Sequence, residues 1–228
     1  MYLRDLAVHA DNAIVERYKG GFVQRFHREA SSVVDHYLSK IVPQVVTEGI
    51  AKVSLTFTDE LEEPPVYSQG RSMYPWPFDF AAYNSATLNQ FKQQLVLESL
   101  HNALVWMAEH EGWAIGPLNA ACQDILDCHF KFTGYSKKSW LCPRKLYRAR
   151  IYFDWQLEGV ELSAILYRNR SSAELARTPL GTAIPMGGML HQYLNAGKWQ
   201  TETIFTAAAS SPFRKEMVVD FAAQMAEN

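Results

Sequence analysis

Residues 147–166 read Tyr-Arg-Ala-Arg-Ile-Tyr-Phe-Asp-Trp-Gln-Leu-Glu-Gly-Val-Glu-Leu-Ser-Ala-Ile-Leu, and this stretch decides the fold class. Apolar and polar residues alternate from Tyr147 to Trp155, and apolar residues return at every second position from Val160 onward. Period-two alternation is typical of a β-strand with a buried face. The intervening residues 156–159 include a glycine and have the length of a hairpin turn. The stretch therefore predicts an antiparallel β-hairpin.

Helical periodicity dominates the first forty residues. Apolar residues recur at steps of three or four from Val15 to Ile41, which places them on one face of a helix. Gly20 and Gly21 interrupt this pattern, and each glycine costs a helix about 1 kcal/mol relative to alanine. We expect a break at this pair and a helix end at Pro43.

One strand and two more helices are expected between residues 50 and 130. Residues 53–58 alternate and predict a strand with one buried face. A long helix is expected to start with Asn84 or Ser85 as its N-cap and to end at Gly112, and Pro117 is expected to open the next helix. The predicted inward positions of the long helix are Leu88, Phe91, Leu95, Leu100, Leu104 and Met107.

The C-terminal part is less regular. The pair Gly187-Gly188 indicates a turn, and residues 201–206 are compatible with a strand. Ser211-Pro212 predicts the start of a C-terminal helix that would include Met217 and Val218. The predicted fold class is α+β, with N-terminal and central helices packed on a mainly antiparallel sheet and a helix at the C-terminus. We find no linker or repeat and expect residues 1–228 to form a single domain.

Composition and charge narrow the function classes. The chain has 228 residues, 48% of them hydrophobic, and no run of 18 apolar residues that would predict a membrane span. The N-terminus shows no secretion signal, and three cysteines (Cys122, Cys128, Cys142) suit reduced, buried thiols, so we expect a cytoplasmic protein. The net charge is only −2 but is uneven. Residues 1–130 carry 9 Lys/Arg against 16 Asp/Glu, whereas residues 131–170 carry 9 against 3.

Motifs for catalysis or metal binding are missing from the sequence. No phosphate-binding glycine loop, nucleophile elbow or His-Glu-x-x-His motif is present. Cys122 and Cys128 are six residues apart, which on a helix separates them by about 240° around the axis. His101 and His110 would face opposite sides of the long helix, and His191 remains a lone candidate for a general base. We expect no catalytic residue, no metal and no cofactor.

The segment 59–78 is the best candidate for a binding surface. An acidic run is followed by aromatic residues that alternate with prolines, and such a segment suits a protein-binding anchor in which aromatics supply affinity and charges steer approach. The alternative is that the aromatics only fasten the loop to the core. The predicted partner-binding residues are Asp59, Glu60, Glu62, Glu63, Tyr74, Trp76 and Phe78.

A basic stretch offers a different hypothesis. Cations and aromatics interleave over residues 135–152, as on a sheet that binds single-stranded nucleic acid, with Tyr147 and Tyr152 as stacking candidates. An ordinary polar sheet face is the alternative. Because the chain as a whole is acidic and lacks an RNA-binding signature, we do not expect nucleic acid as the partner.

The order of elements resembles a known class of proteins. The resemblance rests on residues 95–101 and 109–113, on a Phe130-x-Phe132 helix ending, and on the arginine-rich strand 148–153 with its partner strand. Over residues 50–170 the layout resembles small bacterial α+β immunity proteins that accompany polymorphic or secreted antibacterial toxins. The resemblance implies a stoichiometric inhibitor that blocks a toxin, and it carries over no catalytic residue.

The sequence therefore predicts a non-catalytic protein-binding module, and the resemblance makes its partner a cognate toxin, with a nuclease as one candidate. Two alternatives remain open: an enzyme whose site is assembled from distant residues, such as His191 with a carboxylate, and a nucleic-acid-binding protein that uses residues 137–152. Membrane binding is not expected. Exposed aromatics could also mark a homodimer contact.

Overall fold

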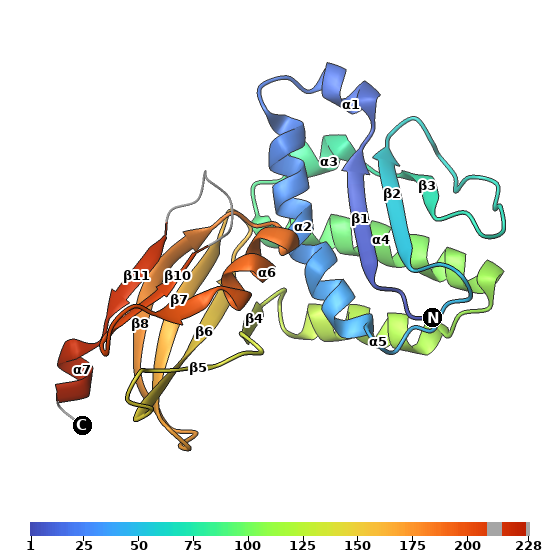
Figure 1. Ribbon diagram of the computed structural model, residues 1–228. Helices are drawn as coiled ribbons and strands as arrows, with labels where there is room; N and C mark the ends of the chain where they lie inside the picture. The colour runs from blue at the N-terminus through green and yellow to red at the C-terminus, as the bar shows by residue number, and fades with distance from the viewer. Residues whose placement is uncertain (209–215, 227–228) are drawn as a thin grey trace. The chain divides into compact units, whose positions relative to one another are not determined.

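The computed structural model describes residues 1–208 and 216–226, with only the backbone described for residues 187–189. Helices and mainly antiparallel strands occur in the same chain, which confirms the α+β class (Figure 1). The chain divides into two compact units, Met1–Lys131 and Phe132–Asn228, and we describe each unit by itself. That the whole chain is a single domain stays a prediction.

The first unit combines a small sheet with helices. Its strands are ordered β1-β2-β3 and all run parallel, with Leu6 opposite Val53 and Leu55 opposite Tyr74. Parallel neighbours need a crossover connection, and the chain between β1 and β2 supplies it with two helices. The elements are β1 (Asp5–Ala10), α1 (Asn12–Arg17), α2 (Phe22–Ile41), β2 (Lys52–Thr58), β3 (Met73–Pro77), α3 (Phe80–Ser85), α4 (Asn89–Glu111) and α5 (Ile115–Asp127).

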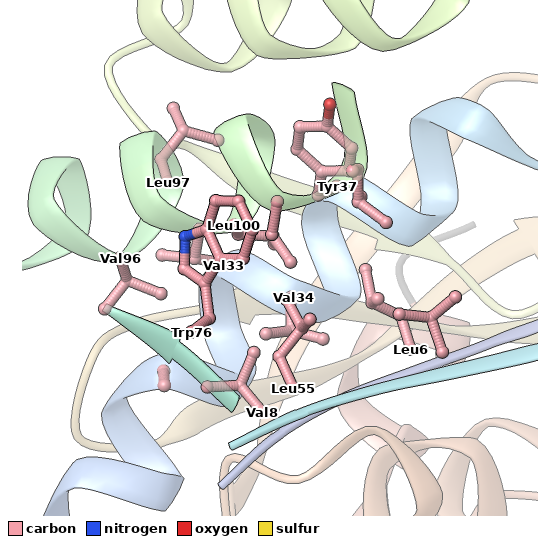
Figure 2. Close-up of a cluster of buried hydrophobic side chains, with 14 of the residues drawn as sticks. Leu6, Val8, Val33, Val34, Tyr37, Leu55, Trp76, Val96, Leu97 and Leu100 are labelled. Carbon is pink, nitrogen blue, oxygen red and sulfur yellow. The ribbon is translucent and has the colours of Figure 1, made fainter. Parts of the chain in front are cut away.

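The core of the first unit lies between this sheet and helices α2 and α4 (Figure 2). Val8 and Leu55 project from the strands toward helix α2, which contributes Val33 and Val34, and all four side chains are buried. Complete burial of a side chain of this size stabilises the fold by roughly 1.5–3 kcal/mol. The same packing fixes the end of β3, because Trp76 belongs to this cluster.

Several expectations for this unit are corrected. Residues 5–10 form a strand and not the start of a helix. The break at Gly20-Gly21 is confirmed, since both glycines adopt left-handed φ angles of 74° and 78°. The long helix begins at Asn89 and not near Ser85, because residues up to Ser85 form the separate helix α3, after which the backbone becomes extended at Ala86. Leu88 and Phe91 are consequently exposed.

The second unit is an antiparallel β structure. The predicted hairpin is confirmed as β6 and β7, which pair from Tyr147 opposite Arg168 to Trp155 opposite Val160. Four strands follow the order β4-β6-β7-β8, β5 also pairs with β6, and a second sheet has the order β11-β10-β9. The elements are β4 (Phe132–Tyr135), β5 (Trp140–Leu141), β6 (Tyr147–Trp155), β7 (Val160–Arg168), β8 (Glu174–Ala183), α6 (Gly187–Asn195), β9 (Gly197–Trp199), β10 (Ile204–Ala207), β11 (Met217–Asp220) and α7 (Ala222–Ala226).

Two C-terminal expectations are wrong and one lies outside the described residues. Gly187 opens helix α6 and does not form a turn. Met217 and Val218 belong to strand β11, so the C-terminal helix is the short α7. The predicted helix start at Ser211-Pro212 lies outside the described residues.

The three cysteines are free, but only Cys142 is buried, whereas Cys122 and Cys128 are half-buried. The expectation of three buried thiols therefore holds for one of them. Within the described part of the chain, no helix combines the length and the apolar character needed to cross a bilayer.

Candidate functional site

The acidic loop, residues 59–66, leaves the carboxyl end of β2. Thr58 shapes its start, since the Thr58 Oγ1 atom accepts a hydrogen bond of 3.2 Å from the backbone N–H of Glu60. Asp59 forms an ion pair with Arg17 at the end of α1. Glu60, Glu62 and Glu63 are exposed to solvent. The structure therefore presents three carboxylates of the predicted run to solvent and uses the fourth to fasten the loop.

A shallow hollow of about 440 Å³ lies at the base of the acidic loop. Its lining includes two carboxylates, because Asp79 follows β3 just as Asp59 follows β2, and the two strands are parallel neighbours. The Asp79 Oδ1 atom accepts a 2.8 Å hydrogen bond from the backbone N–H of Ala82, which fixes its direction. The apolar lining comprises Leu61, Pro77 and Phe78.

The tip of the acidic loop carries an exposed aliphatic side chain. Val66 is 91% exposed and follows the rigid pair Pro64-Pro65. The chain directly after the tip is tied to α4, since the Tyr67 hydroxyl and the Gly70 N–H both donate to the Oε1 atom of Glu111. A loop that is held at both ends loses less conformational entropy when a partner binds.

The predicted aromatic anchors lie in the core. Tyr74 and Trp76 are 1% and 4% exposed, and Trp76 packs on Trp106 of α4 with 5.5 Å between ring centroids. Phe78 is also buried and stacks on Phe57, although its edge lines the hollow. The buried positions of these aromatics fit the alternative hypothesis, in which they fasten the loop to the core. Sequence reasoning missed Val66, whose only signal was an aliphatic residue directly after two prolines in an acidic run.

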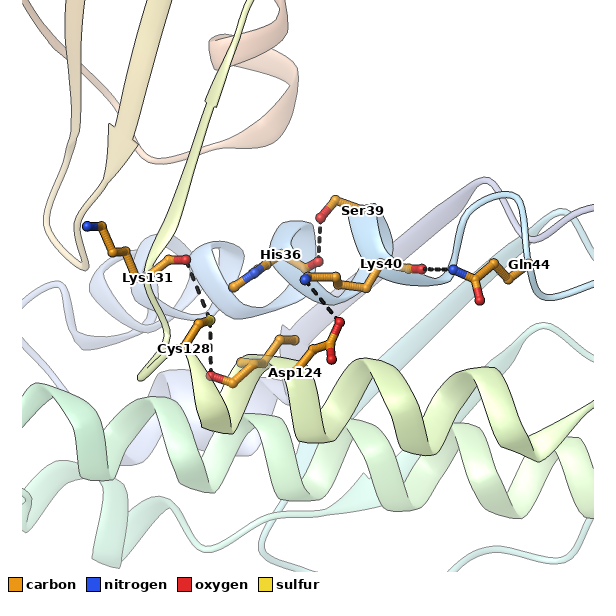
Figure 3. Close-up of polar contacts among 8 residues, drawn as sticks. His36, Ser39, Lys40, Gln44, Asp124, Cys128 and Lys131 are labelled. Carbon is orange, nitrogen blue, oxygen red and sulfur yellow. Dashed lines mark hydrogen bonds and ion pairs between the residues drawn. The ribbon is translucent and has the colours of Figure 1, made fainter.

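His27 and His36 of helix α2 both have lowered pKa values because their rings are withdrawn from solvent. The Nε2 atom of His27 accepts the backbone N–H of Ala10 at 3.0 Å, so this ring is neutral, and burial together with the neighbouring His9 lowers its pKa. Figure 3 shows His36 near the ion pair between Lys40 and Asp124. Burial and, to a smaller extent, the Lys40 charge lower the pKa of His36 to about 4.

A tyrosine bridge joins helices α2, α4 and α5. The Tyr37 hydroxyl lies 3.0 Å from the carbonyl of Leu118 and 2.8 Å from Nδ1 of His101. Since the hydroxyl has one proton and the carbonyl can only accept, the Nδ1 atom of His101 donates to the tyrosine oxygen. Burial lowers the pKa of His101, in keeping with a neutral ring. This arrangement is a structural contact between three helices.

The side chain of His191, the candidate general base, contacts Asn195 one turn later in the exposed part of α6. Among the described residues, no three His, Cys, Asp or Glu side chains are placed to hold a metal ion. The hollow is lined by two aspartates and three apolar residues. Such a surface can bind a cationic group.

The basic sheet of the second unit differs from the predicted stacking platform. Tyr147 packs on the unit's core, whereas Tyr152 lies on the opposite face, so the two do not line one groove. On that opposite face Arg177 lies over the Tyr152 ring at 4.2 Å, and Arg150 lies over Tyr135 at 4.9 Å. The arginine and tyrosine side chains thus cover one another, as on a polar sheet face.

A comparison with known proteins found no relative of this chain. No protein-family model, no curated protein and no solved structure matches this chain. The interpretation of the candidate site therefore rests on the geometry of this chain alone.

Proposed function

We propose that this protein is a non-catalytic binding protein that neutralises a bacterial toxin by occupying its surface. The observation that carries the proposal is the acidic loop, which presents Glu60, Glu62, Glu63 and the exposed Val66 from a segment anchored at both ends. Charges of one sign accelerate the approach of an oppositely charged partner, and a preorganised apolar contact adds affinity.

The chemistry of the loop suggests the chemistry of the partner. A surface with several carboxylates around one apolar side chain is complementary to a basic surface on the partner. The hollow lined by Asp59 and Asp79 has room for a lysine or arginine side chain of that partner. Nucleases attract phosphates with basic surfaces, so a nuclease toxin is the class that we propose first. The resemblance of residues 50–170 to immunity proteins supports a toxin as the partner, and the choice of a nuclease rests on the acidic surface alone.

The test uses the product of the gene next to the one that encodes this protein. We would measure by calorimetry how tightly that gene product binds the unmodified protein (the parent protein), and test whether the parent protein protects growing cells from that gene product. A triple reversal, E60K/E62K/E63K, combined with V66S should weaken binding by at least about tenfold and abolish protection.

The control reverses three exposed glutamates of the same unit outside the loop, E16K/E48K/E109K, which changes the net charge by the same amount. It should bind and protect like the parent protein. Equal losses in both variants would show that net charge alone matters. Full protection by the loop variant would show that the acidic loop is not the binding site.

A further inference from the structure

The two units carry opposite charge. Residues 1–131 have 10 Lys/Arg against 16 Asp/Glu, a net charge of −6, and residues 132–228 have 12 against 8, a net charge of +4. Each unit also has an exposed segment in which several charges of its prevailing sign gather. In the first unit this segment is the acidic loop.

In the second unit the corresponding segment is formed by two neighbouring turns, residues 143–146 and 168–170, which we call the basic turns. Asn169 joins them, because its backbone N–H donates to the Leu146 carbonyl and its side-chain amide donates to the Lys145 carbonyl, both at 2.8 Å. Lys145 and Arg170 adopt left-handed φ angles of 60° and 65°. The exposed cations of the basic turns are Arg144, Lys145, Arg168 and Arg170.

The two exposed segments match in more than charge. Val66, 91% exposed, stands beside the carboxylates of the acidic loop, and Leu146, 61% exposed, stands beside the cations of the basic turns. Each segment thus offers one uncovered aliphatic side chain whose charged neighbours within the segment all have the same sign. Among the described residues, Glu62 and Glu63 take part in no ion pair, and the ion pair of Arg144 with Glu202 is solvent-exposed at 3.7 Å.

From this complementarity we propose that the acidic loop of one molecule docks on the basic turns of a second copy of the chain. Val66 then packs against Leu146, and the carboxylates face the cations. The contact comprises only a few residues on each side, so the association is weak and transient. Because the acidic loop is also the surface proposed for the toxin, self-association and toxin binding compete.

The experiment is sedimentation equilibrium of the full chain over a range of concentrations. At an ionic strength of about 0.01 M, where the Debye length is about 30 Å, the average mass should rise with concentration. At about 1 M, where that length is about 3 Å, the rise should disappear. A protein that stays monomeric at low salt and high concentration overturns the proposal.

A charge exchange identifies the surfaces. The acidic-loop variant is E60K/E62K/E63K, and the basic-turn variant is R144E/K145D/R170D, with aspartate at the two left-handed positions because it tolerates that conformation better than glutamate. Each exposed ion pair contributes little, so loss of three should weaken self-association about tenfold in each variant alone. An equimolar mixture restores opposite charges at both contacts and should associate like the parent protein.

The matched control is K137E/K138E/K198E, which changes the charge of the second unit equally at exposed sites outside the basic turns. It should self-associate like the parent protein. A loss as large as in the basic-turn variant, or a mixture that fails to recover, overturns the proposal. So does a monomeric parent protein that binds a DNA duplex through the basic turns.

The proposed function is tested separately by the same reagents. The basic-turn variant keeps its acidic loop intact, so it should bind the toxin at least as tightly as the parent protein does. Loss of self-association with retained toxin binding supports both proposals, whereas self-association without any toxin binding rejects only the proposed function.

Discussion

The hydroxyl of Tyr83 donates a hydrogen bond of 2.5 Å to the Oε2 atom of Glu29, which places a buried carboxylate of α2 in contact with α3. Lys92 of α4 approaches the same oxygen at 3.3 Å, and Arg25 lies 3.9 Å from the other carboxylate oxygen. Three helices of the first unit therefore meet at one buried acidic side chain.

Removal of the Lys92 charge should destabilise the first unit. In K92M the carboxylate of Glu29 stays buried while its closest cation is lost, which we expect to lower the free energy of unfolding by about 3 kcal/mol. Urea denaturation measures the change. The control is K40M, which breaks the more exposed ion pair with Asp124 and should cost no more than about 1 kcal/mol. Similar losses in both variants would contradict a special role for the buried carboxylate.

Stability should fall when the pH is lowered from about 6.5 to about 4. The pKa of His36 is about 4 in the folded protein, below its ordinary value of 6.5, so in this range the unfolded chain binds the proton and the folded chain does not. The contribution of His36 to the stability is present in full above pH 6.5. Up to about 3 kcal/mol of it is lost as the pH falls through the pKa that His36 has in the folded protein. Denaturation at a series of pH values should show a flatter dependence for H36Q, and an unchanged slope would assign the effect to other groups.

Substitution of Trp76 should change mainly the stability, whereas substitution of Val66 should change mainly partner binding. W76A leaves a cavity between β3 and α4 and should lower the free energy of unfolding by about 3–5 kcal/mol. V66S changes an exposed side chain and should alter it by no more than about 0.5 kcal/mol, while it weakens partner binding. Thermal denaturation together with the binding assay compares the two. A fully stable W76A would show that the indole does not lie in the core.

Substitution of two glycines by alanine should change the stability in opposite directions. A Cβ atom at Gly134 in β4 would lie 2.8 Å from the ring of Phe153, so G134A should destabilise the second unit by about 1–3 kcal/mol. At Gly116 in α5 a Cβ atom would meet nothing within 4 Å, and G116A should stabilise the helix by up to about 1 kcal/mol. Denaturant midpoints of the two variants provide the check, and a neutral G134A would contradict the close approach.

Sequence alone determined the features that depend on local periodicity. The hairpin of β6 and β7 was predictable because Ala149, Ile151 and Phe153 follow the two-residue repeat of a strand whose core lies on one side. The helix break at Gly20-Gly21 and the end of α4 at Gly112 were predictable because a left-handed backbone favours glycine. The acidic run was also visible directly.

Tertiary structure decided the features that depend on distant partners. The parallel strands β1 and β3 gain their hydrogen bonds from β2, so their short sequences carry little signal of their own. Trp76 is buried because Trp106 of α4 packs on it, and a similar sequence without that helix could expose the ring. Lys145 and Asn169 became neighbours only through the pairing of β6 with β7. Contacts of this kind join residues far apart in the chain, so neither composition nor periodicity could reveal which aromatic rings are covered and which charges share a surface.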